Sequence, residues 1–353
     1  MANRPIDRPH KAPPRRPDRP APRHDAGPAR PSAAPALKRP LPPTLGPRLA
    51  SEAIGNVLVT DGWDDYRLLD MGEGEKLERY GDLVVARPEP QAMGPRRLPA
   101  AVWADAGAAF TGDTDEEGPG RWRKADGIGD AWQMSVMDIP ITCQLTSFRH
   151  VGIFAEQIVH WRWMAERIAA RLAAGGERPR LLNLFGYTGI ASLIAARAGA
   201  EVTHVDASKK SVAWGRDNQA LAGLEAAPIR WIVDDAVKFT ERETRRGRLY
   251  DGILVDPPRF GRGPDGEVWS LTEDLPYLVG LVRELMKPGP SFMTLTAYAI
   301  RASFLSIHEL VADLVGHRPG TLTSGELAVR ETGLEDTTGR LLSTSMFARF
   351  EGN

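Results

Sequence analysis

The stretch from Leu181 to Ser208, LLNLFGYTGIASLIAARAGAEVTHVDAS, places the strongest constraint on the fold of this chain. An apolar run is followed by a glycine-containing turn, apolar residues at helical spacing, a second apolar run and an aspartate. This order is expected of a β–α–β unit, in which a helix joins two parallel strands. Ligands of such units bind beyond the carboxyl ends of the strands, so we expect a binding site beside Gly186 and Asp206.

Strand-like and helix-like segments alternate from about residue 151 onward. Five apolar runs predict parallel strands: RLLNLF, EVTHVD, IRWIV, YDGILVD and PSFMTLTAY. Two further strand-like runs follow, GTLTSGELAVRE and LLSTSMFARFE. Because parallel strands need crossover connections that cover the sheet, we predict a Rossmann-like α/β domain over residues 151–353. Its doubly wound sheet has seven strands, and the last two pair antiparallel at one edge.

Residues 51–150 have a different pattern. Short alternating segments are interrupted by Gly-Glu-Gly and Gly-Asp turns, which is typical of antiparallel strands. We therefore predict a smaller N-terminal antiparallel β domain over this range.

Residues 1–50 differ again, in charge and in proline content. They hold 11 Lys or Arg residues against 3 Asp, and 14 of the chain's 29 prolines, although the whole chain has a net charge of -1. Such a segment cannot bury enough apolar surface to offset the entropy of ordering, so we predict a disordered basic arm. The arm is compatible with RNA binding and equally with a solubilising leader.

The chain shows no signal-peptide pattern and no membrane-spanning length of apolar residues, so we expect a cytoplasmic protein.

The turn Gly186-Tyr187-Thr188-Gly189 limits which nucleoside can bind. A triphosphate-binding loop has Lys followed by Ser or Thr after its last glycine, whereas Gly189 is followed by Ile-Ala. A dinucleotide fold prefers G-x-G-x-x-G, of which only the second half is present. Asp206 ends the second strand, where a carboxylate can accept hydrogen bonds from both ribose hydroxyls. This role suits NAD and S-adenosylmethionine alike, and capping of the following helix is the alternative role for Asp206.

The end of the third strand favours an adenosine ligand. An acid at this place can accept a hydrogen bond from the adenine amino group, and the next backbone N–H can reach a ring nitrogen. Asp235 is the first choice for this role, with Ala236 providing the N–H, and Asp234 is the alternative acid.

The end of the fourth strand, Asp256-Pro257-Pro258, favours S-adenosylmethionine over NAD. The two prolines stiffen the turn and remove two N–H donors, so that a carboxylate and carbonyl groups remain to accept hydrogen bonds from an exocyclic amine. Phe260 is near enough in the sequence to stack on a planar base. A dehydrogenase has no use for such a turn.

In this order, NLFGYTG, VDAS, DDA and DPPRFGRG strongly resemble the motifs of a family of bacterial class I methyltransferases. This family includes the large-subunit ribosomal RNA base methyltransferases, especially those of the cytosine-C5 type, and the resemblance covers roughly residues 150–315. It implies S-adenosylmethionine as cofactor and ribosomal RNA as the leading substrate. The first motif and the segment FRHVGIFAEQ imply further donor contacts, from Asn183, Phe185, Gly186, Thr188 and Gly189, and from Phe154 and Gln157.

Two features depart from this family. Cytosine-C5 transfer needs a thiolate that adds to C6 of the ring, and in the C5 enzymes that cysteine follows strand five. Here the corresponding stretch reads FMTLTAYAIRAS, and the chain's one cysteine, Cys143, lies in an alternating β segment. We expect Cys143 to be a buried apolar residue. The family's N-terminal RNA-binding module is replaced by the basic arm and the β domain.

We therefore predict an S-adenosylmethionine-dependent methyltransferase that modifies a nucleobase of RNA by direct transfer. Its predicted catalytic residues are Asp256, Pro257, Pro258 and Phe260. The alternatives are a protein or small-molecule acceptor, which the acidic body favours, and a non-catalytic scaffold that binds the donor. Arg259 and Arg262 lie on the catalytic loop, where they meet phosphates or solvent. We expect a structural role for His160 on its amphipathic helix, and the sequence has no metal-ligand spacing.

Overall fold

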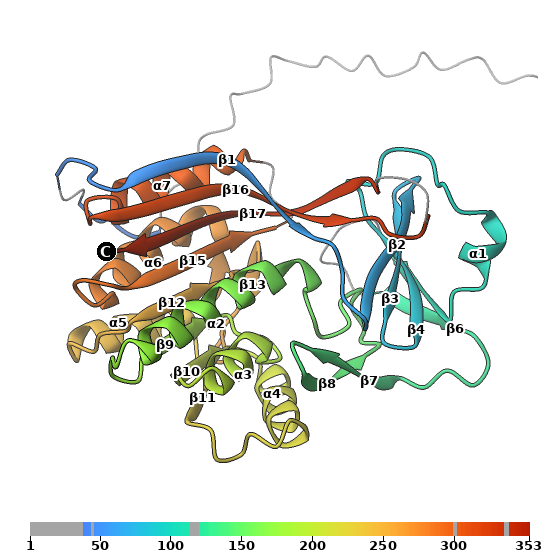
Figure 1. Cartoon of the computed structure of the whole chain (residues 1–353), viewed down its shortest axis with the longest axis horizontal. Helices are drawn as coiled ribbons and strands as arrows, with labels where there is room; N and C mark the ends of the chain where they lie inside the picture. Colours follow the sequence, from blue (N-terminus) through green and yellow to red (C-terminus); the bar gives the residue numbers. More distant parts are fainter. Residues whose placement is uncertain (1–37, 44–45, 113–119, 299–301, 335–338) are drawn as a thin grey trace, which may run out of the picture. The chain divides into compact units, whose positions relative to one another are not determined.

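The computed structural model describes residues 38–43, 46–112, 120–298, 302–334 and 339–353. Its largest element is an eight-stranded sheet of order β1-β16-β17-β15-β12-β9-β10-β11 (Figure 1). In this order the strands are Ser51–Thr60, Gly320–Arg330, Leu341–Gly352, Phe292–Ala297, Gly252–Val255, Arg180–Leu184, Glu201–Asp206 and Ile229–Val233. All neighbours are parallel except for the two pairs that β17 makes. The seven predicted strands are therefore present, and β1 adds an eighth.

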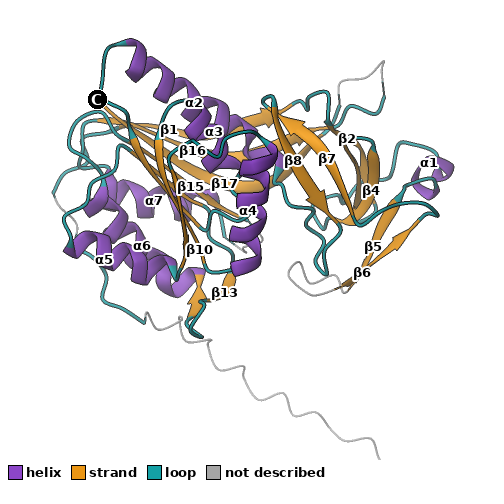
Figure 2. Ribbon diagram, turned by 90° about the horizontal axis from the view of Figure 1, so that it is seen from below, coloured by secondary structure: helices purple, strands orange, loops and turns teal. Residues whose placement is uncertain are grey.

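Helices cover both faces of this sheet (Figure 2). One hydrophobic cluster contains Leu181 and side chains of three helices, α2 (Ile158–Ala173), α3 (Ile190–Arg197) and α4 (Lys209–Leu221). The other contains Leu182 and Leu184 and side chains of α5 (Ala236–Arg245), α6 (Leu271–Leu285) and α7 (Phe304–Val315). Because successive side chains of a strand point to opposite faces, β9 is buried on both sides. This explains the continuous apolar runs of the predicted strands.

β1 departs from the predicted domain boundaries. Residues 51–60 were expected to belong to the antiparallel domain, but they pair in parallel with β16 of the large sheet, with Ser51 opposite Thr321. The partner strand is 270 residues away along the chain. An edge strand has a similar alternating pattern whichever sheet it joins, so its sequence alone does not identify that partner.

The smaller β domain follows β1. Its five-stranded sheet has the order β2-β3-β4-β5-β6, and a separate hairpin is formed by β7 and β8. The elements are β2 (Tyr66–Gly72), β3 (Glu75–Tyr80), β4 (Leu83–Pro88), α1 (Ala100–Ala104), β5 (Ala108–Gly112), β6 (Gly120–Lys124), β7 (Ala131–Val136) and β8 (Ile139–Gln144). All its pairs are antiparallel except β4–β5. An N-terminal antiparallel β domain is thus confirmed, with one parallel pair that was not predicted.

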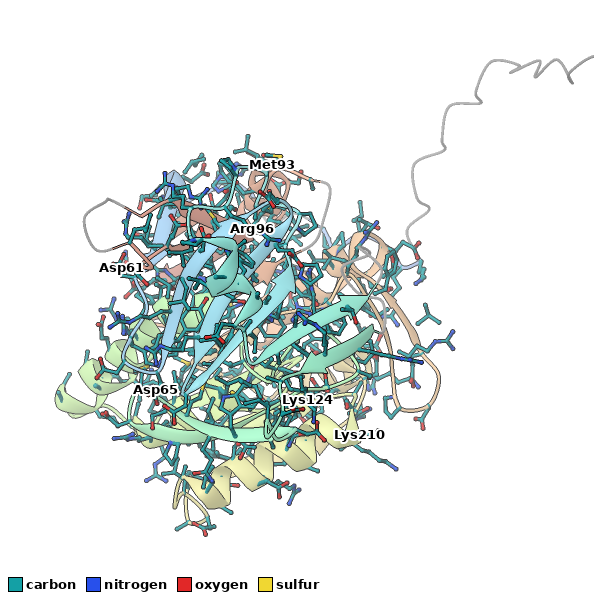
Figure 3. All side chains as sticks on the ribbon, turned by 90° about the vertical axis from the view of Figure 1, so that its right-hand side faces the viewer. Asp61, Asp65, Met93, Arg96, Lys124 and Lys210 are labelled. Carbon is teal, nitrogen blue, oxygen red and sulfur yellow. The ribbon has the colours of Figure 1, made fainter. Side chains whose placement is uncertain are left out.

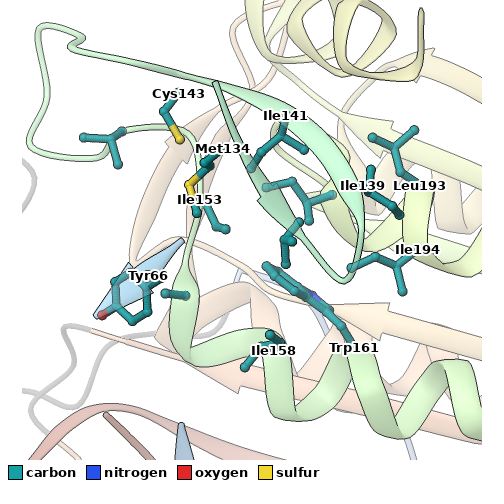
Figure 4. Close-up of a cluster of buried hydrophobic side chains, with 14 of the residues drawn as sticks. Tyr66, Met134, Ile139, Ile141, Cys143, Ile153, Ile158, Trp161, Leu193 and Ile194 are labelled. Carbon is teal, nitrogen blue, oxygen red and sulfur yellow. The ribbon is translucent and has the colours of Figure 1, made fainter. Parts of the chain in front are cut away.

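Two sets of contacts join this domain to the large sheet. Apolar side chains of β8, such as Ile139 and Ile141, belong to the same cluster as Trp161 of α2 and Leu193 of α3 (Figure 4). At the far end of the β16–β17 hairpin, the Arg340 guanidinium donates to Asp70 Oδ1 at 2.9 Å and to Glu331 Oε1 at 2.6 Å. The β domain is therefore joined to the large domain by apolar packing at β8 and by ion pairs at the β16–β17 hairpin.

Part of the predicted basic arm packs against the large domain. A Cβ added to Gly280 of α6 would lie 2.6 Å from the Pro42 side chain, and Arg283 donates to the Pro43 carbonyl at 2.8 Å. Arg48 pairs with Glu309 of α7 at 2.6 Å. The remaining arm, residues 1–37 and 44–45, lies outside the described residues. In the part of the chain that the structure describes, no helix has the length and apolarity needed to cross a membrane.

Candidate active site

Two adjoining cavities lie at the carboxyl ends of the parallel strands. The larger has a volume of about 880 Å³, within the range of small-molecule sites, and receives residues that follow β9, β10, β11 and β12. The smaller has a volume of about 60 Å³. Four residues line both cavities: Phe154, Phe185, Tyr187 and Asp256. The cavities thus occupy the edge of the sheet where the sequence predicts the ligand.

The turn from β9 to α3 brings backbone to both cavities. Phe185 and Tyr187 have φ angles of +56° and +51°, and Gly189 has +80°. Left-handed backbone is costly for residues other than glycine, and such strain is common at binding sites. Gly186 meets a different requirement, because a Cβ there would lie 2.4 Å from Cε1 of His204. The first glycine therefore allows close packing, and the second allows a positive φ.

We predict that Gly186→Ala lowers the free energy of unfolding by about 1–3 kcal/mol, the usual cost of overpacking, and weakens binding of the predicted methyl donor. The reason is that His204 or the turn must move to admit the new methyl group. Gly129→Ala is the matched control, because its added Cβ would meet no atom closer than 3.6 Å. Thermal unfolding and titration with S-adenosylhomocysteine test this, and equal behaviour of the two variants would contradict it.

Asp206 lies where the sequence predicts it, at the end of β10 and at the wall of the larger cavity. Its Oδ2 accepts a hydrogen bond from the Tyr187 N–H at 2.9 Å and its Oδ1 from the Ser208 N–H at 2.8 Å. Burial raises the pKa of this carboxyl, and the two N–H groups oppose the shift. Ser208 caps α4 with its own hydroxyl, which accepts from the Ser211 N–H. Each carboxylate oxygen of Asp206 keeps a lone pair for a ligand.

Asp234, Asp235 and Ala236 all line the larger cavity, at the start of α5. Asp235 is the N-cap of this helix, and its Oδ1 accepts from the Lys238 N–H at 2.9 Å. Asp234 forms an ion pair with Arg242 and accepts from the N–H of Asp235. Both acids thus have structural partners, and Asp235 retains a carboxylate oxygen for which no such partner is described.

Asn183 and Thr188 line the smaller cavity only. The Asn183 amide donates to Ser192 Oγ at 2.9 Å, and this oxygen lies 3.0 Å from His204 Nδ1. The Thr188 hydroxyl donates to the Gly152 carbonyl at 2.6 Å. These two residues stabilise the turn between β9 and α3. Through Ser192, Asn183 also connects β9 to His204 of β10.

Asp256 follows β12 and lies between the two cavities. Its Oδ1 accepts a hydrogen bond from the Thr296 hydroxyl, and its Oδ2 accepts one from Nε2 of Gln157 at 3.3 Å. The Gln157 amide also donates to Thr296 Oγ1 at 3.1 Å. Burial raises the pKa of Asp256 to about 6, against the opposing effect of the Thr296 hydroxyl. A carboxylate with this pKa is ionised at neutral pH and can take up a proton readily.

Of the other predicted catalytic residues, one lines the larger cavity and two do not. Pro258 lines the larger cavity, whereas Pro257 is buried and lines neither. Phe260 belongs to a hairpin formed by β13 (Phe260–Arg262) and β14 (Val268–Ser270) and is 55% exposed. Its ring contacts the Arg259 guanidinium and does not line either cavity. The structure therefore does not bring Phe260 to the position of a base-stacking residue.

Aromatic residues that the sequence motifs did not identify as site residues line the larger cavity instead. They are Phe148, His150, Tyr187, Trp214, Trp269 and Tyr298. Phe154 connects several of them, with ring centroids 4.8 Å from His150, 5.7 Å from Tyr187 and 5.8 Å from Tyr298. Their only signal in the sequence is their residue type, because no spacing relates positions that are so far apart in the chain.

Cys143 is fully buried among apolar side chains, as expected (Figure 4). Burial raises the pKa of its thiol to about 12, so the nucleophilic thiolate is scarce at neutral pH. His160 is also buried and lines the smaller cavity, and burial lowers its pKa to about 3. Among the described residues, no group of three or more His, Cys, Asp or Glu side chains is arranged to hold a metal ion.

We expect Cys143→Ala to keep the rate of methyl transfer within about twofold of the wild type. The substitution removes one buried sulfur atom and is expected to cost about 1 kcal/mol in unfolding free energy. Transfer rates of purified wild type and variant, compared with their melting temperatures, provide the test. Loss of activity in a folded variant, together with a covalent RNA–protein adduct in the wild type, would show a thiol mechanism and contradict direct transfer.

A family model described as S-adenosylmethionine-dependent methyltransferase matches residues 117–312. A crystal structure of a SAM-dependent methyltransferase from Agrobacterium tumefaciens shares 49% sequence identity and superposes with a TM-score of 0.84, over 89% of this chain and 98% of that chain. A candidate methyltransferase, SMU.776, complexed with SAH, shares 18% identity with a TM-score of 0.62, over 81% of this chain and 75% of that one. The latter likeness is one of fold.

Curated relatives are similar over a smaller part of their length. The ribosomal RNA large subunit methyltransferase K/L of Shewanella sp. (strain ANA-3) is 28% identical over 250 residues, which are 65% of this chain and 34% of the relative. The protein of the same name from Shewanella frigidimarina is 27% identical over 270 residues, 69% of this chain and 36% of the relative. The chain thus spans about a third of the length of these relatives. With the family model matching more than half of its residues, the chain belongs to the S-adenosylmethionine-dependent methyltransferase family.

Proposed function

We propose that this enzyme methylates a nucleobase of RNA by direct transfer from S-adenosylmethionine to a nitrogen atom. The observation that carries the proposal is Asp256, a carboxylate at the wall of a cavity of about 880 Å³ and next to a rigid proline turn. The names of the curated relatives, which state methylation of large-subunit ribosomal RNA, support the choice of RNA.

The chain's residues suit the donor, which supplies an electrophilic methyl group when bound. Asp206 would accept from the two ribose hydroxyls, because both of its oxygens retain a lone pair beside their N–H partners. Asp235 is favoured over Asp234 for the adenine amino group, because Asp234 is engaged by Arg242. Gly186 and Phe154 would border the methionine part of the donor, at the smaller cavity.

Asp256 would orient the acceptor amine and take up the proton that the nitrogen loses on methylation. Gln157 and Thr296 fix the carboxylate by one hydrogen bond to each oxygen, which leaves lone pairs for the amine. The raised pKa of Asp256, about 6, brings its proton affinity closer to neutral pH than that of an ordinary carboxylate. Direct transfer to nitrogen requires no thiol, in keeping with the burial of Cys143.

The proposal is tested with purified protein, donor labelled in the methyl group, and total RNA, soluble protein and small metabolites from cells that lack the gene. Label in large-subunit RNA, located at one base nitrogen by nuclease digestion and mass spectrometry, is the expected result. Label confined to protein or to small molecules would replace the RNA substrate by one of these acceptors. Tight donor binding without transfer to any fraction would indicate a non-catalytic scaffold.

A further inference from the structure

Charges are distributed unequally around the larger cavity. Four of its acids are buried or half-buried in the wall: Asp206, Asp234, Asp235 and Asp256. Among the described residues that line it, the cationic ones are Lys210 and Arg262, and both are exposed, as is one further acid, Asp217. The acidic wall repels phosphate and suits a cationic donor and the amino edge of a base. Of the described lining residues, the two cations at the mouth are those that attract phosphate groups.

The two mouth cations come from different elements. Lys210 lies in the first turn of α4, and Arg262 lies in the β13–β14 hairpin. Neither forms an ion pair with another residue among those that the structure describes. By contrast, Lys238 and Arg242 nearby are paired with Glu267 and Asp234. Figure 3 shows the molecule from the side of the β domain, with Lys210 labelled. Two cations without ion-pair partners at one cavity mouth can bind the phosphates of an RNA backbone that passes across it.

An exposed aromatic ring completes this mouth. Phe148 lines the cavity although it is 48% exposed. It belongs to the lip loop, residues 146–150, which the β domain holds in place. The Trp122 indole donates to the Thr146 carbonyl at 2.8 Å, the Gly120 N–H donates to the Ser147 carbonyl at 2.8 Å, and the Phe148 N–H donates to Thr146 Oγ1 at 3.1 Å.

A large apolar ring on a loop with these restraints loses little entropy on binding a ligand. The residues around Phe148 also indicate which kind of nucleic acid can bind there. Unpaired bases stack on aromatic side chains, and cations that line the same cavity as such a ring can bind the phosphates of a single strand. A duplex keeps its bases stacked and offers none to the ring or to the cavity.

Resting on the proposed function, we infer that Phe148, Lys210 and Arg262 form a clamp for single-stranded RNA at the mouth of the cavity. Phe148 stacks on a base next to the one that enters the cavity, and the two cations bind phosphates on either side. The β domain thereby holds the lip loop, and with it Phe148, in position to contact the RNA. The clamp distinguishes single-stranded RNA from a duplex, and the cavity determines which base is methylated.

The test measures binding of a short fluorescein-labelled single-stranded RNA and of the same RNA in a duplex, by anisotropy with S-adenosylhomocysteine present. Phe148→Ala is expected to weaken single-strand binding about tenfold, the loss of one base–aromatic stack, and Phe148→Trp to preserve it. Met93→Ala is the control, because Met93 is an exposed apolar residue of the β domain (Figure 3) and does not line the cavity. Lys210→Ala and Arg262→Ala should each lower the slope of log Kd against log salt by about one. Arg248→Ala should leave the slope unchanged, because Arg248 is exposed, precedes the amino end of β12 and does not line the cavity.

The outcomes separate this inference from the proposed function. If the wild type methylates RNA and Phe148→Ala binds and methylates it equally well, the clamp is wrong and the proposed function stands. Equal affinity of the wild type for single strand and duplex would also overturn the clamp. Wild type that binds S-adenosylhomocysteine but neither binds nor methylates RNA would overturn both.

Discussion

Replacing Asp256 by alanine is expected to lower the rate of methyl transfer about a hundredfold or more, while the affinity for S-adenosylhomocysteine changes by less than about tenfold. Positioned acids and bases contribute about 10²–10⁴-fold to the rates of proton-coupled reactions, and Asp256 has both of its oxygens held by Gln157 and Thr296. Single-turnover transfer to RNA and calorimetric titration of the donor product give the two quantities.

The pH dependence provides a sharper test of the same residue. Burial raises the pKa of Asp256 to about 6, so the carboxylate is present above this pH and is lost by protonation below it. The wild-type rate should therefore fall about tenfold for each pH unit below 6 and level off above it. Asp256→Asn keeps a carbonyl acceptor but cannot titrate, so its lower rate should be independent of pH in this range.

A second carboxyl near Asp256 needs its own control. Burial raises the pKa of Glu156 to about 6 as well. Glu156→Gln should keep the wild-type profile, because Glu156 does not line either cavity. If the acidic limb instead persisted in Asp256→Asn and disappeared in Glu156→Gln, the titrating group would be Glu156, and the proposed role of Asp256 would be wrong.

Asp206→Ala is expected to weaken donor binding about a hundredfold or more. Two hydrogen bonds from ribose hydroxyls to a carboxylate contribute about 1.5–3 kcal/mol each, and 1.4 kcal/mol corresponds to a factor of ten in affinity. Isothermal titration with S-adenosylmethionine measures the loss. Asp206 also accepts from the Tyr187 N–H, so the melting temperature is needed to separate a loosened turn from a lost ligand contact.

Asp217→Ala is the matched control for this variant. Asp217 lines the same cavity, but it is exposed on α4 and has no predicted role in donor binding. Its affinity for the donor should remain within about twofold of the wild type. Unchanged affinity in Asp206→Ala, with the fold intact, would mean that the donor lies elsewhere.

Much of the large domain can be read from the sequence, because parallel strands that are buried on both faces leave continuous apolar runs. The order of these runs, the turn at Gly186 and the acids at the strand ends placed the cavity correctly. Asp206, Asp234, Asp235 and Asp256 all line it, since the carboxyl ends of parallel strands necessarily meet at one edge of the sheet. Local pattern and topology together suffice for this part.

Other features depend on contacts between distant segments. The pairing of β1 with β16 joins positions that are 270 residues apart, and no local pattern records such a partner. Phe260 follows the Asp256-Pro257-Pro258 turn in sequence, yet it belongs to the β13–β14 hairpin and is exposed to solvent. Phe148, from the chain between the two domains, lies at the cavity instead. Proximity in sequence was a poor guide here, because a hairpin reverses the chain direction within a few residues.

By itself, then, the sequence determined the class of sheet, the edge of that sheet at which the cavity lies and the acids at that edge, because strand burial and β–α–β connections are properties of local order. Only the tertiary structure decided which aromatic residues surround the cavity, which of its acids retain lone pairs and where cations without ion-pair partners lie at its mouth. These depend on packing and on hydrogen bonds between segments far apart in the chain, such as those that hold Asp256 between Gln157 and Thr296.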